Sequence, residues 1–150
     1  MPTGVGLLDV NVLVALFDPD HVHHEMAHGW FAENREHGWA TCPVTENGFL
    51  RVLASPAYGS PVARPAELLQ RLQRFCASGN HHFWGDTVSL RDATVFNAVY
   101  AASHRQLDGV YLLGLAAKMG GRLVTFEQQI PFKAIVGGGA DSLVVISTGG

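Results

Sequence analysis

The sequence has few cysteines, few charges and no long hydrophobic run, and each shortage excludes a class of protein. Cys42 and Cys76 are the two cysteines among 150 residues. They are too few for a disulfide scaffold and lack C-x-x-C spacing, so we expect buried thiols in a reducing compartment. No apolar stretch approaches the roughly 20 residues of a membrane span, and no basic segment precedes an apolar run at the N-terminus. We therefore expect a soluble, cytoplasmic protein without membrane contacts.

A surplus of positive charge is also missing. The chain has 10 basic and 13 acidic residues, a formal net charge of -3 and a pI near 6.2. Composition therefore predicts no global field that would attract nucleic acid, and any such contact would depend on a local patch. With 47% hydrophobic residues, a chain of this length has the size of one domain. We expect one domain over residues 1–150, with residues 148–150 as a flexible tail.

Short apolar runs alternate with segments of helical periodicity along the chain. The runs VGLLDV, WATC, RLVTF and SLVVIS favour strands. Helices are predicted from Asn11, over Val22–His37 and from Pro43, a residue that suits the first turn of a helix. Further helical segments are PAELLQRLQRFCAS, FNAVYAAS and LDGVYLLGLAAKMGG, with a helical turn in EQQIPFKAI. This alternation predicts an α/β fold, a three-layer α/β/α sandwich with a central parallel sheet.

One short motif suggests zinc chemistry. His24–His28 reads HEMAH, which matches the H-E-x-x-H signature in which two helical imidazoles hold zinc and the glutamate activates water. The longer form of the motif is not continued, because Phe31 and Asn34 stand at its glycine and histidine positions. A helical wheel places both histidines off the apolar stripe, toward solvent. We expect exposed histidines here and keep a zinc metalloprotease as the weaker alternative.

Acidic residues directly follow two of the predicted strands. Asp9 ends the first apolar run, and Glu127 follows RLVTF. Ligands of parallel α/β sheets bind at the carboxyl ends of the strands, so we expect these two carboxylates to share one edge. Thr125 lies beside Glu127 and offers its hydroxyl to a water or a substrate oxygen. This edge is the candidate functional site.

Two further acids interrupt apolar helix faces. Glu46 and Asp108 each have large apolar residues at positions i+3, i+4 and i+7, which places both carboxylates on faces expected to be buried. Taken singly, the four acids have ordinary explanations: helix caps for Asp9 and Asp108, an ion pair with Arg51 or Arg105 for Glu46, and exposure for Glu127.

Taken together, the four acids favour a shared cation. Carboxylates in one pocket repel each other by about 4 kcal/mol per contact at ~4 Å and an effective dielectric of 20. A divalent metal ion removes that cost. Ligation by oxygen atoms alone suits Mg²⁺ or Mn²⁺, and these ions suit the cleavage of phosphate esters.

Three longer segments occur in a familiar order. LLDVNVLVAL, TENGFLRVL and LDGVYLLGLAAKMGGRLVTF, the last followed by an acid, resemble the PIN-domain ribonucleases of the VapC toxin type over nearly the whole chain. The resemblance implies a parallel sheet between helices, a metal site of four acids and RNA cleavage that depends on Mg²⁺ or Mn²⁺. It also implies a homodimer or a hetero-oligomer with a cognate VapB-type antitoxin, which inhibits the toxin.

The family's functional positions fall on the acids already singled out. The resemblance implies that the catalytic and metal-binding residues are Asp9, Glu46, Asp108 and Glu127. Asn11 and Thr125 match polar positions near the family's metal site and are expected to orient a water or a phosphate oxygen.

The sequence also departs from the family pattern. Val10 and Leu107 replace threonines that are common there, and Glu127 replaces the usual aspartate. Glutamate adds one methylene, which shifts the carboxylate by about one C–C bond.

The expected activity is that of a metal-dependent endoribonuclease that cleaves RNA with a metal-activated water. The alternative is a catalytically weak PIN module that acts through a partner. Candidate phosphate contacts are Arg51, Arg91, Arg105 and Lys133, and Trp84 is a candidate for stacking on a base. Taken one by one, solvated cations and a core tryptophan are the favoured interpretations of these residues. A groove for the antitoxin, or else ordinary core packing, is expected at Val12, Leu16, Phe17 and Trp30.

Overall fold

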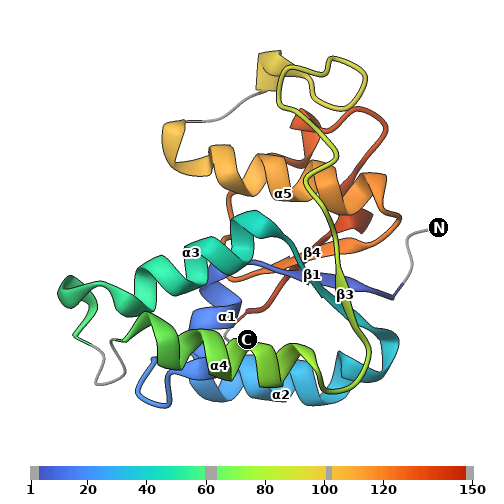
Figure 1. Ribbon diagram of the computed structural model, residues 1–150. Coiled ribbons are helices and arrows are strands. Elements are labelled where there is room, and N and C mark those ends of the chain that lie inside the picture. Colours follow the sequence, from blue (N-terminus) through green and yellow to red (C-terminus); the bar gives the residue numbers. More distant parts are fainter. Residues whose placement is uncertain (1–3, 60–63, 101–102, 148–150) are drawn as a thin grey trace.

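A parallel sheet of five short strands organises the molecule (Figure 1). The computed structural model describes residues 4–59, 64–100 and 103–147, so the predicted tail at 148–150 lies outside the described residues. The sheet has the order β3-β2-β1-β4-β5, and each pair of neighbouring strands is parallel. The strands are β1 (Gly6–Leu8), β2 (Trp39–Thr41), β3 (His81–Phe83), β4 (Arg122–Thr125) and β5 (Leu143–Val145).

Helices cover both faces of the sheet, which confirms the predicted three-layer sandwich. Because neighbouring residues of a strand point to opposite faces, Leu7 packs in the half of the core beneath α5, and Leu8 packs in the half formed with α1 to α4. The α-helices are α1 (Val10–Phe17), α2 (His24–Asn34), α3 (Pro43–Ala54), α4 (Pro65–Cys76) and α5 (Leu107–Lys118).

Four predicted strands and the main helices are present, with two corrections. The second helix is shorter than the predicted Val22–His37: α2 ends at Asn34, and a 3-10 turn leads to Gly38, whose φ of 94° suits glycine. Residues 96–103 were predicted to be helical, but their described part forms a single 3-10 turn, Ala98–Tyr100. The backbone there bonds across to a later loop, as in Asn97 N to Ala134 O (2.8 Å).

β3 was not among the predicted strands, because its HHF sequence is not an apolar run. It is an edge strand, and Phe83 in it is exposed. Trp84, the next residue, is 6% exposed and belongs to the core. The favoured interpretation of Trp84 as a core residue is therefore confirmed, and base stacking, the weaker alternative, is wrong. Of the two thiols expected to be buried, Cys42 is buried and Cys76 is half-buried.

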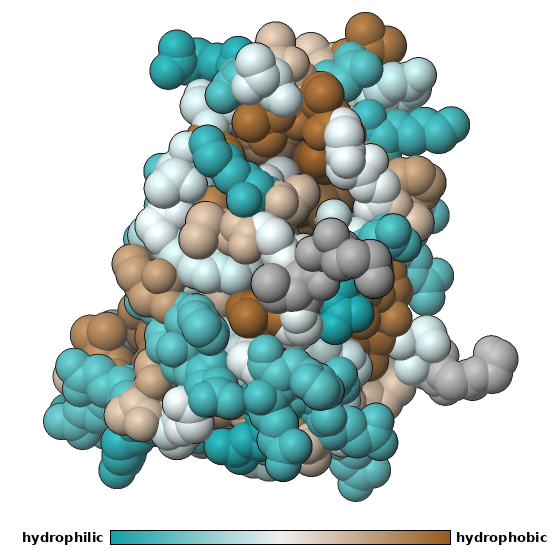
Figure 2. Space-filling model, turned by 90° about the vertical axis from the view of Figure 1, so that its right-hand side faces the viewer, coloured by the Kyte–Doolittle hydropathy of each residue, from teal (hydrophilic) through white to brown (hydrophobic). Residues whose placement is uncertain are grey.

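The surface differs between the two ends of the face in Figure 2. Its lower part, where α2 and α4 lie, is mainly hydrophilic, and hydrophobic side chains gather in its upper part. No helix in the described parts of the chain is long and apolar enough to cross a membrane.

Strand register brings the ends of β1 and β4 together. Leu8 pairs with Val124, and the Asp9 amide donates to the Val124 carbonyl oxygen at 2.9 Å. Asp9 and Thr125 therefore leave the sheet side by side, although 116 residues separate them.

Candidate active site

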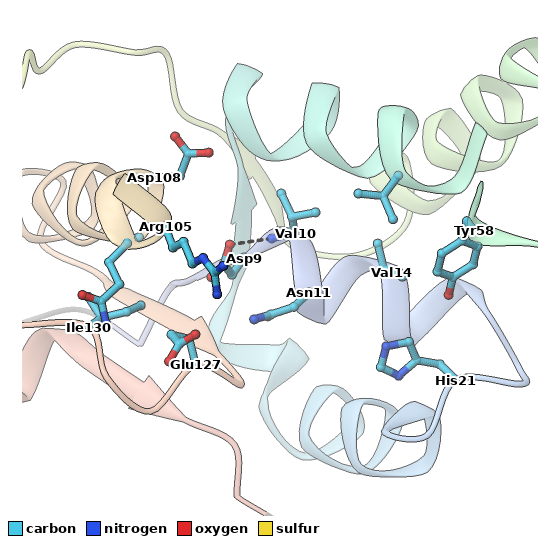
Figure 3. A pocket seen from close by; sticks show the side chains of 13 residues that line it. Asp9, Val10, Asn11, Val14, His21, Tyr58, Arg105, Asp108, Glu127 and Ile130 are labelled. Carbon is cyan, nitrogen blue, oxygen red and sulfur yellow. Dashed lines mark hydrogen bonds between the residues drawn. The ribbon is translucent and has the colours of Figure 1, made fainter. Parts of the chain in front are cut away.

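A pocket of about 400 Å³ opens at the carboxyl edge of the sheet (Figure 3). Three predicted acids line it, from the start of α1, the first turn of α5 and the segment after β4. Its polar lining residues include Asp9, Asn11, Arg105, Asp108 and Glu127. The structure thus brings three of the four predicted acids together, and the position of strand ends in parallel sheets predicts this for Asp9 and Glu127.

Asp9 is the most buried of these acids, and both of its oxygens are bonded. Oδ1 accepts from the Val10 amide (2.7 Å) and Oδ2 accepts from the Thr125 hydroxyl (2.8 Å). Burial raises the pKa of Asp9, the two hydrogen bonds oppose that rise, and the nearby charges of Asp108 and Glu127 add to it. The carboxylate is therefore held in one orientation while its negative charge is disfavoured.

Thr125 is the centre of a small hydrogen-bond network. Its hydroxyl donates to Asp9 and accepts from Asn11 Nδ2 (3.2 Å) and from the Glu127 amide (3.0 Å). The side chain is fully buried, so it does not offer its hydroxyl to a water or phosphate, contrary to the prediction from the sequence. Asn11 is fixed at its other end, because Oδ1 accepts from the Phe126 amide (3.3 Å). Both residues orient the acids.

Asp108 and Glu127 are exposed at the rim of the pocket. The helical wheel predicted a buried Asp108, but this residue stands in the first turn of α5. An acid there interacts favourably with the positive end of the helix dipole. Glu127 Oε1 accepts from the Gln129 amide (3.0 Å), which turns the segment after β4 back toward the pocket.

The structure separates Glu46 from the other three acids, contrary to the prediction. Glu46 does not line the pocket; its Oε2 accepts from the Thr41 hydroxyl at 2.6 Å, toward β2 and β3. A different residue of α3 faces α1: Gly48, where an added Cβ would lie 2.6 Å from Val10 Cγ2. The apolar spacing identified a half-buried face of α3 but not the element that covers it.

Arg105 is the predicted cation that the structure places at the pocket. Its exposed side chain reaches in beside Asp9 (Figure 3). Arg51, Arg91 and Lys133 are exposed and do not line this pocket. Of the four candidate phosphate contacts, Arg105 is therefore the one at this pocket.

Sequence reasoning missed the far end of the pocket, where Tyr58 and His21 lie. The Tyr58 hydroxyl donates to Asp18. This bond lowers the pKa of Asp18, while burial and the bond together raise the pKa of Tyr58 to about 12. Tyr58 and Asp18 are 40 residues apart in the chain, and no local pattern connects them.

The two histidines of the HEMAH motif were expected to face solvent, but both donate hydrogen bonds to backbone carbonyl groups. His24 Nδ1 donates to the Ala15 carbonyl oxygen (2.7 Å), and His28 Nε2 donates to that of Leu16 (2.9 Å). These carbonyls lie in the last turn of α1, where no amide of the same helix is available to them. The motif therefore joins α2 to the end of α1.

No protein-family model matches the sequence. Relatives from Mycobacterium tuberculosis do: Ribonuclease VapC44 is 45% identical over 132 residues, which cover 88% of this chain and 92% of that protein. Ribonuclease VapC39 is 38% identical over 88% of this chain and 95% of its own length, and Ribonuclease VapC38 is 43% identical over 82% and 85%. The chain belongs to the VapC family of ribonucleases. The resemblance of its motifs to VapC toxins is thereby confirmed.

The acid pocket of this VapC-family chain suits a hard divalent cation. Asp9, Asp108 and Glu127 offer oxygen atoms, and their mutual repulsion contributes to the raised pKa of Asp9. In the described part of the chain, the carboxylate oxygens of these three acids do not all lie within 4.8 Å of one another.

Proposed function

We propose that this protein is a metal-dependent endoribonuclease toxin that cleaves RNA phosphodiester bonds. The convergence of Asp9, Asp108 and Glu127 in one pocket supports this proposal most directly. Membership of the VapC ribonuclease family supports the RNA substrate. We further propose that residues 1–150 act as one PIN domain.

In this proposal Asp9, Asp108 and Glu127 hold Mg²⁺ or Mn²⁺. Such an ion neutralises charge on the phosphate and lowers the pKa of water, which generates the nucleophile. Asp9 enters the site pre-oriented by Thr125 and the Val10 amide. Asn11 keeps one Nδ2 hydrogen beyond its bond to Thr125, and we assign that donor to a phosphate oxygen or a water at the pocket.

Arg105 is the group we assign to the RNA phosphate. It is exposed, carries a fixed positive charge and lines the same pocket as the acids. A bidentate guanidinium bond to phosphate orients the scissile bond across the carboxylates. Glu46 has no role in this proposal, because its carboxylate bonds Thr41 instead.

We propose that a VapB-type antitoxin neutralises the activity and that the toxin forms a homodimer or a hetero-oligomer with it. Of the four residues expected to form a groove, Val12 is fully buried, so the core alternative is correct for it, whereas Leu16 keeps 6% of its surface exposed. A cavity of about 290 Å³ nearby is lined by Leu16, Phe17 and Phe75 beside Arg71 and Arg74. Its composition suits an apolar side chain flanked by acids.

The decisive experiment is cleavage of a panel of structured RNAs by the purified protein with EDTA, Mg²⁺, Mn²⁺ or Zn²⁺. We expect Mg²⁺ or Mn²⁺ to restore cleavage after EDTA. Asp9→Asn should lower the rate by roughly 100-fold or more, the scale of losing one group that stabilises the transition state. Asp20→Asn, an exposed acid outside the pocket, is the matched control.

Two results would contradict the proposal. Absence of cleavage with every metal would favour the partner-binding PIN module. Activity that required Zn²⁺ and was lost in a double His24→Ala, His28→Ala variant would favour the zinc protease signature, and peptide substrates would then replace RNA in the assay.

A further inference from the structure

A second cluster of ligating side chains lies away from the acid pocket. Glu46 in α3, Cys76 at the end of α4 and His81 at the start of β3 each offer one ligand atom, and these atoms lie within 4.8 Å of one another. None of the three lines the acid pocket. All three side chains are half-buried, so an ion can reach them and is partly shielded from water once bound.

The cluster is already ordered by Thr41, a fully buried residue of β2. The Thr41 hydroxyl donates to Glu46 Oε2 at 2.6 Å, so His81 Nε2, 2.8 Å away, carries the ring hydrogen and donates to it. A metal ion bound at Nε2 replaces that hydrogen, and the neutral ring then carries its hydrogen on Nδ1. The imidazole also packs against the Trp39 ring, with 4.6 Å between ring centroids. These contacts hold Glu46 and His81 toward the same point, so little side-chain freedom remains to be lost on ligand binding.

Thiolate, imidazole and carboxylate together are the ligand set of zinc. Zn²⁺ takes sulfur at about 2.3 Å and nitrogen or oxygen at about 2.0–2.2 Å in tetrahedral geometry, which places ligand atoms roughly 3.3–3.7 Å apart. Because the three ligand atoms lie within 4.8 Å of one another, a contraction of at most about 1 Å reaches this arrangement. Mg²⁺ is not expected here, because it requires oxygen ligands.

We propose that Glu46, Cys76 and His81 bind one Zn²⁺ ion, with the fourth position taken by water. The ion would connect three elements that are separate in sequence: α3, the end of α4 and the edge strand β3. Since such a site forms only when these elements are in place, zinc binding stabilises the folded chain. The site is independent of RNA cleavage and of the acid pocket.

The test is titration of the full-length, tag-free protein with Co²⁺ and then Zn²⁺. Bound Co²⁺ reports a sulfur ligand through its thiolate-to-metal absorption band, and Zn²⁺ displaces it. We expect the band in the wild-type protein, and we expect Cys76→Ser to abolish it. Zinc affinity, measured against a chromophoric chelator, should fall at least about tenfold in Cys76→Ser and in His81→Ala, as for loss of one metal ligand.

The chain offers matched controls for both variants. Cys42→Ser removes the other cysteine, and His82→Ala removes the exposed neighbour of His81. Both controls should keep the cobalt band and the zinc affinity. If a variant fails to fold, alkylation of the wild-type protein gives the same information, because Zn²⁺ should protect Cys76 from a thiol reagent.

Three outcomes would overturn the proposal: no cobalt band in the wild type, no protection of Cys76 by Zn²⁺, or zinc binding of unchanged affinity in Cys76→Ser. The last outcome would exclude Cys76 as a ligand, and alanine variants of the histidines at positions 21, 23, 24 and 28 would then locate the ion. RNA cleavage with Mg²⁺ is measured separately, so failure of this proposal is distinguishable from failure of the proposed ribonuclease function.

Discussion

At the scale of single residues, the Thr125 hydroxyl should affect both RNA cleavage and stability, because one oxygen atom bonds Asp9, Asn11 and the Glu127 amide. Thr125→Val removes the donor to Asp9 and leaves the partners Asn11 and Glu127 without their acceptor. We expect the rate of RNA cleavage to fall by about 10- to 100-fold, the range for residues that orient metal ligands. The unfolding free energy should fall by about 1–3 kcal/mol, because buried polar groups lose their bonds.

Thr125→Ser separates these two effects. Serine keeps the hydroxyl and loses one methyl group, so cleavage should stay near the wild-type rate while stability falls by about 1 kcal/mol. If Thr125→Ser lost as much activity as Thr125→Val, the methyl group and packing, rather than the hydroxyl, would position Asp9.

The bond between Tyr58 and Asp18 predicts a pH dependence of stability. The pKa of Asp18 is lowered from its ordinary value of 3.8 in the folded protein. A lowered pKa contributes stability that is present above the unfolded value and is lost as pH falls through the folded value. The stability advantage of the wild type over Tyr58→Phe should therefore be constant from about pH 5 to 7 and shrink below about pH 4.

Urea unfolding between pH 3 and 7 measures this advantage, and Tyr100→Phe, at an exposed tyrosine, is the control. Equal stability of the wild type and Tyr58→Phe at pH 7 would show that the bond to Asp18 contributes nothing.

At the scale of elements, side chains of α2 and α4 bond three of the carbonyl groups at the end of α1. The four last carbonyl groups of α1 accept from the Asp18 amide, His24, His28 and the Arg71 guanidinium, respectively. Because these helix-end carbonyls lack intrahelical partners, a double His24→Ala, His28→Ala variant should lose about 1–3 kcal/mol per buried carbonyl left without a partner.

Chemical denaturation checks this value, with the exposed Glu25→Gln as control. RNA cleavage at a temperature where the double variant is folded should remain. A loss of zinc-dependent peptide cleavage in either variant would instead restore the protease interpretation of the motif.

Two glycines in helices should respond to alanine with opposite signs. A Cβ at Gly114 in α5 would overlap the Phe96 ring, whereas nothing lies within 4 Å of a Cβ at Gly29 in α2. We expect Gly114→Ala to destabilise the protein by about 1–3 kcal/mol through overpacking. Gly29→Ala should stabilise it by about 0.5–1 kcal/mol through helix propensity.

Thermal denaturation of both variants tests this pair. Destabilisation by both substitutions would mean that backbone conformation, rather than space around the side chain, determines the response at Gly29.

The sequence predicted the helices and strands themselves better than it predicted which of them pack against each other. Apolar runs and helical periodicity identified β1, β2, β4 and β5 and the helices, because these patterns are local. They could not identify β3, whose HHF sequence pairs at an edge. The same limit applies to acids: strand ends identified Asp9 and Glu127, but helical spacing did not tell which element Glu46 faces.

At the scale of the whole molecule, a divalent metal ion bound in the acid pocket should raise the free energy of unfolding. An ion that binds the folded chain alone stabilises it by about 2.7 kcal/mol at 100 times its Kd. We expect the melting temperature to rise with Mg²⁺ concentration in the wild type and to rise less in Asp108→Asn. Differential scanning fluorimetry after EDTA treatment measures this, and Cys76→Ser should keep the Mg²⁺ response because Cys76 lies outside the acid pocket.

An equal Mg²⁺ response in Asp108→Asn and the wild type would place the ion elsewhere. The protein's acidic surface as a whole, with its net charge of -3, would then be the simpler explanation, and the response would decline with added monovalent salt.

The long separation between Asp9 and Thr125 has a consequence during synthesis. Translation produces Asp9 early, but its hydrogen-bond partner follows 116 residues later and Glu127 two residues after that. A growing chain therefore carries no assembled acid pocket until β4 has been made and has left the ribosome. We therefore expect a VapC-family chain of this design to leave RNA intact until β4 has emerged, and products of translation that stop before β4 should show no RNA cleavage.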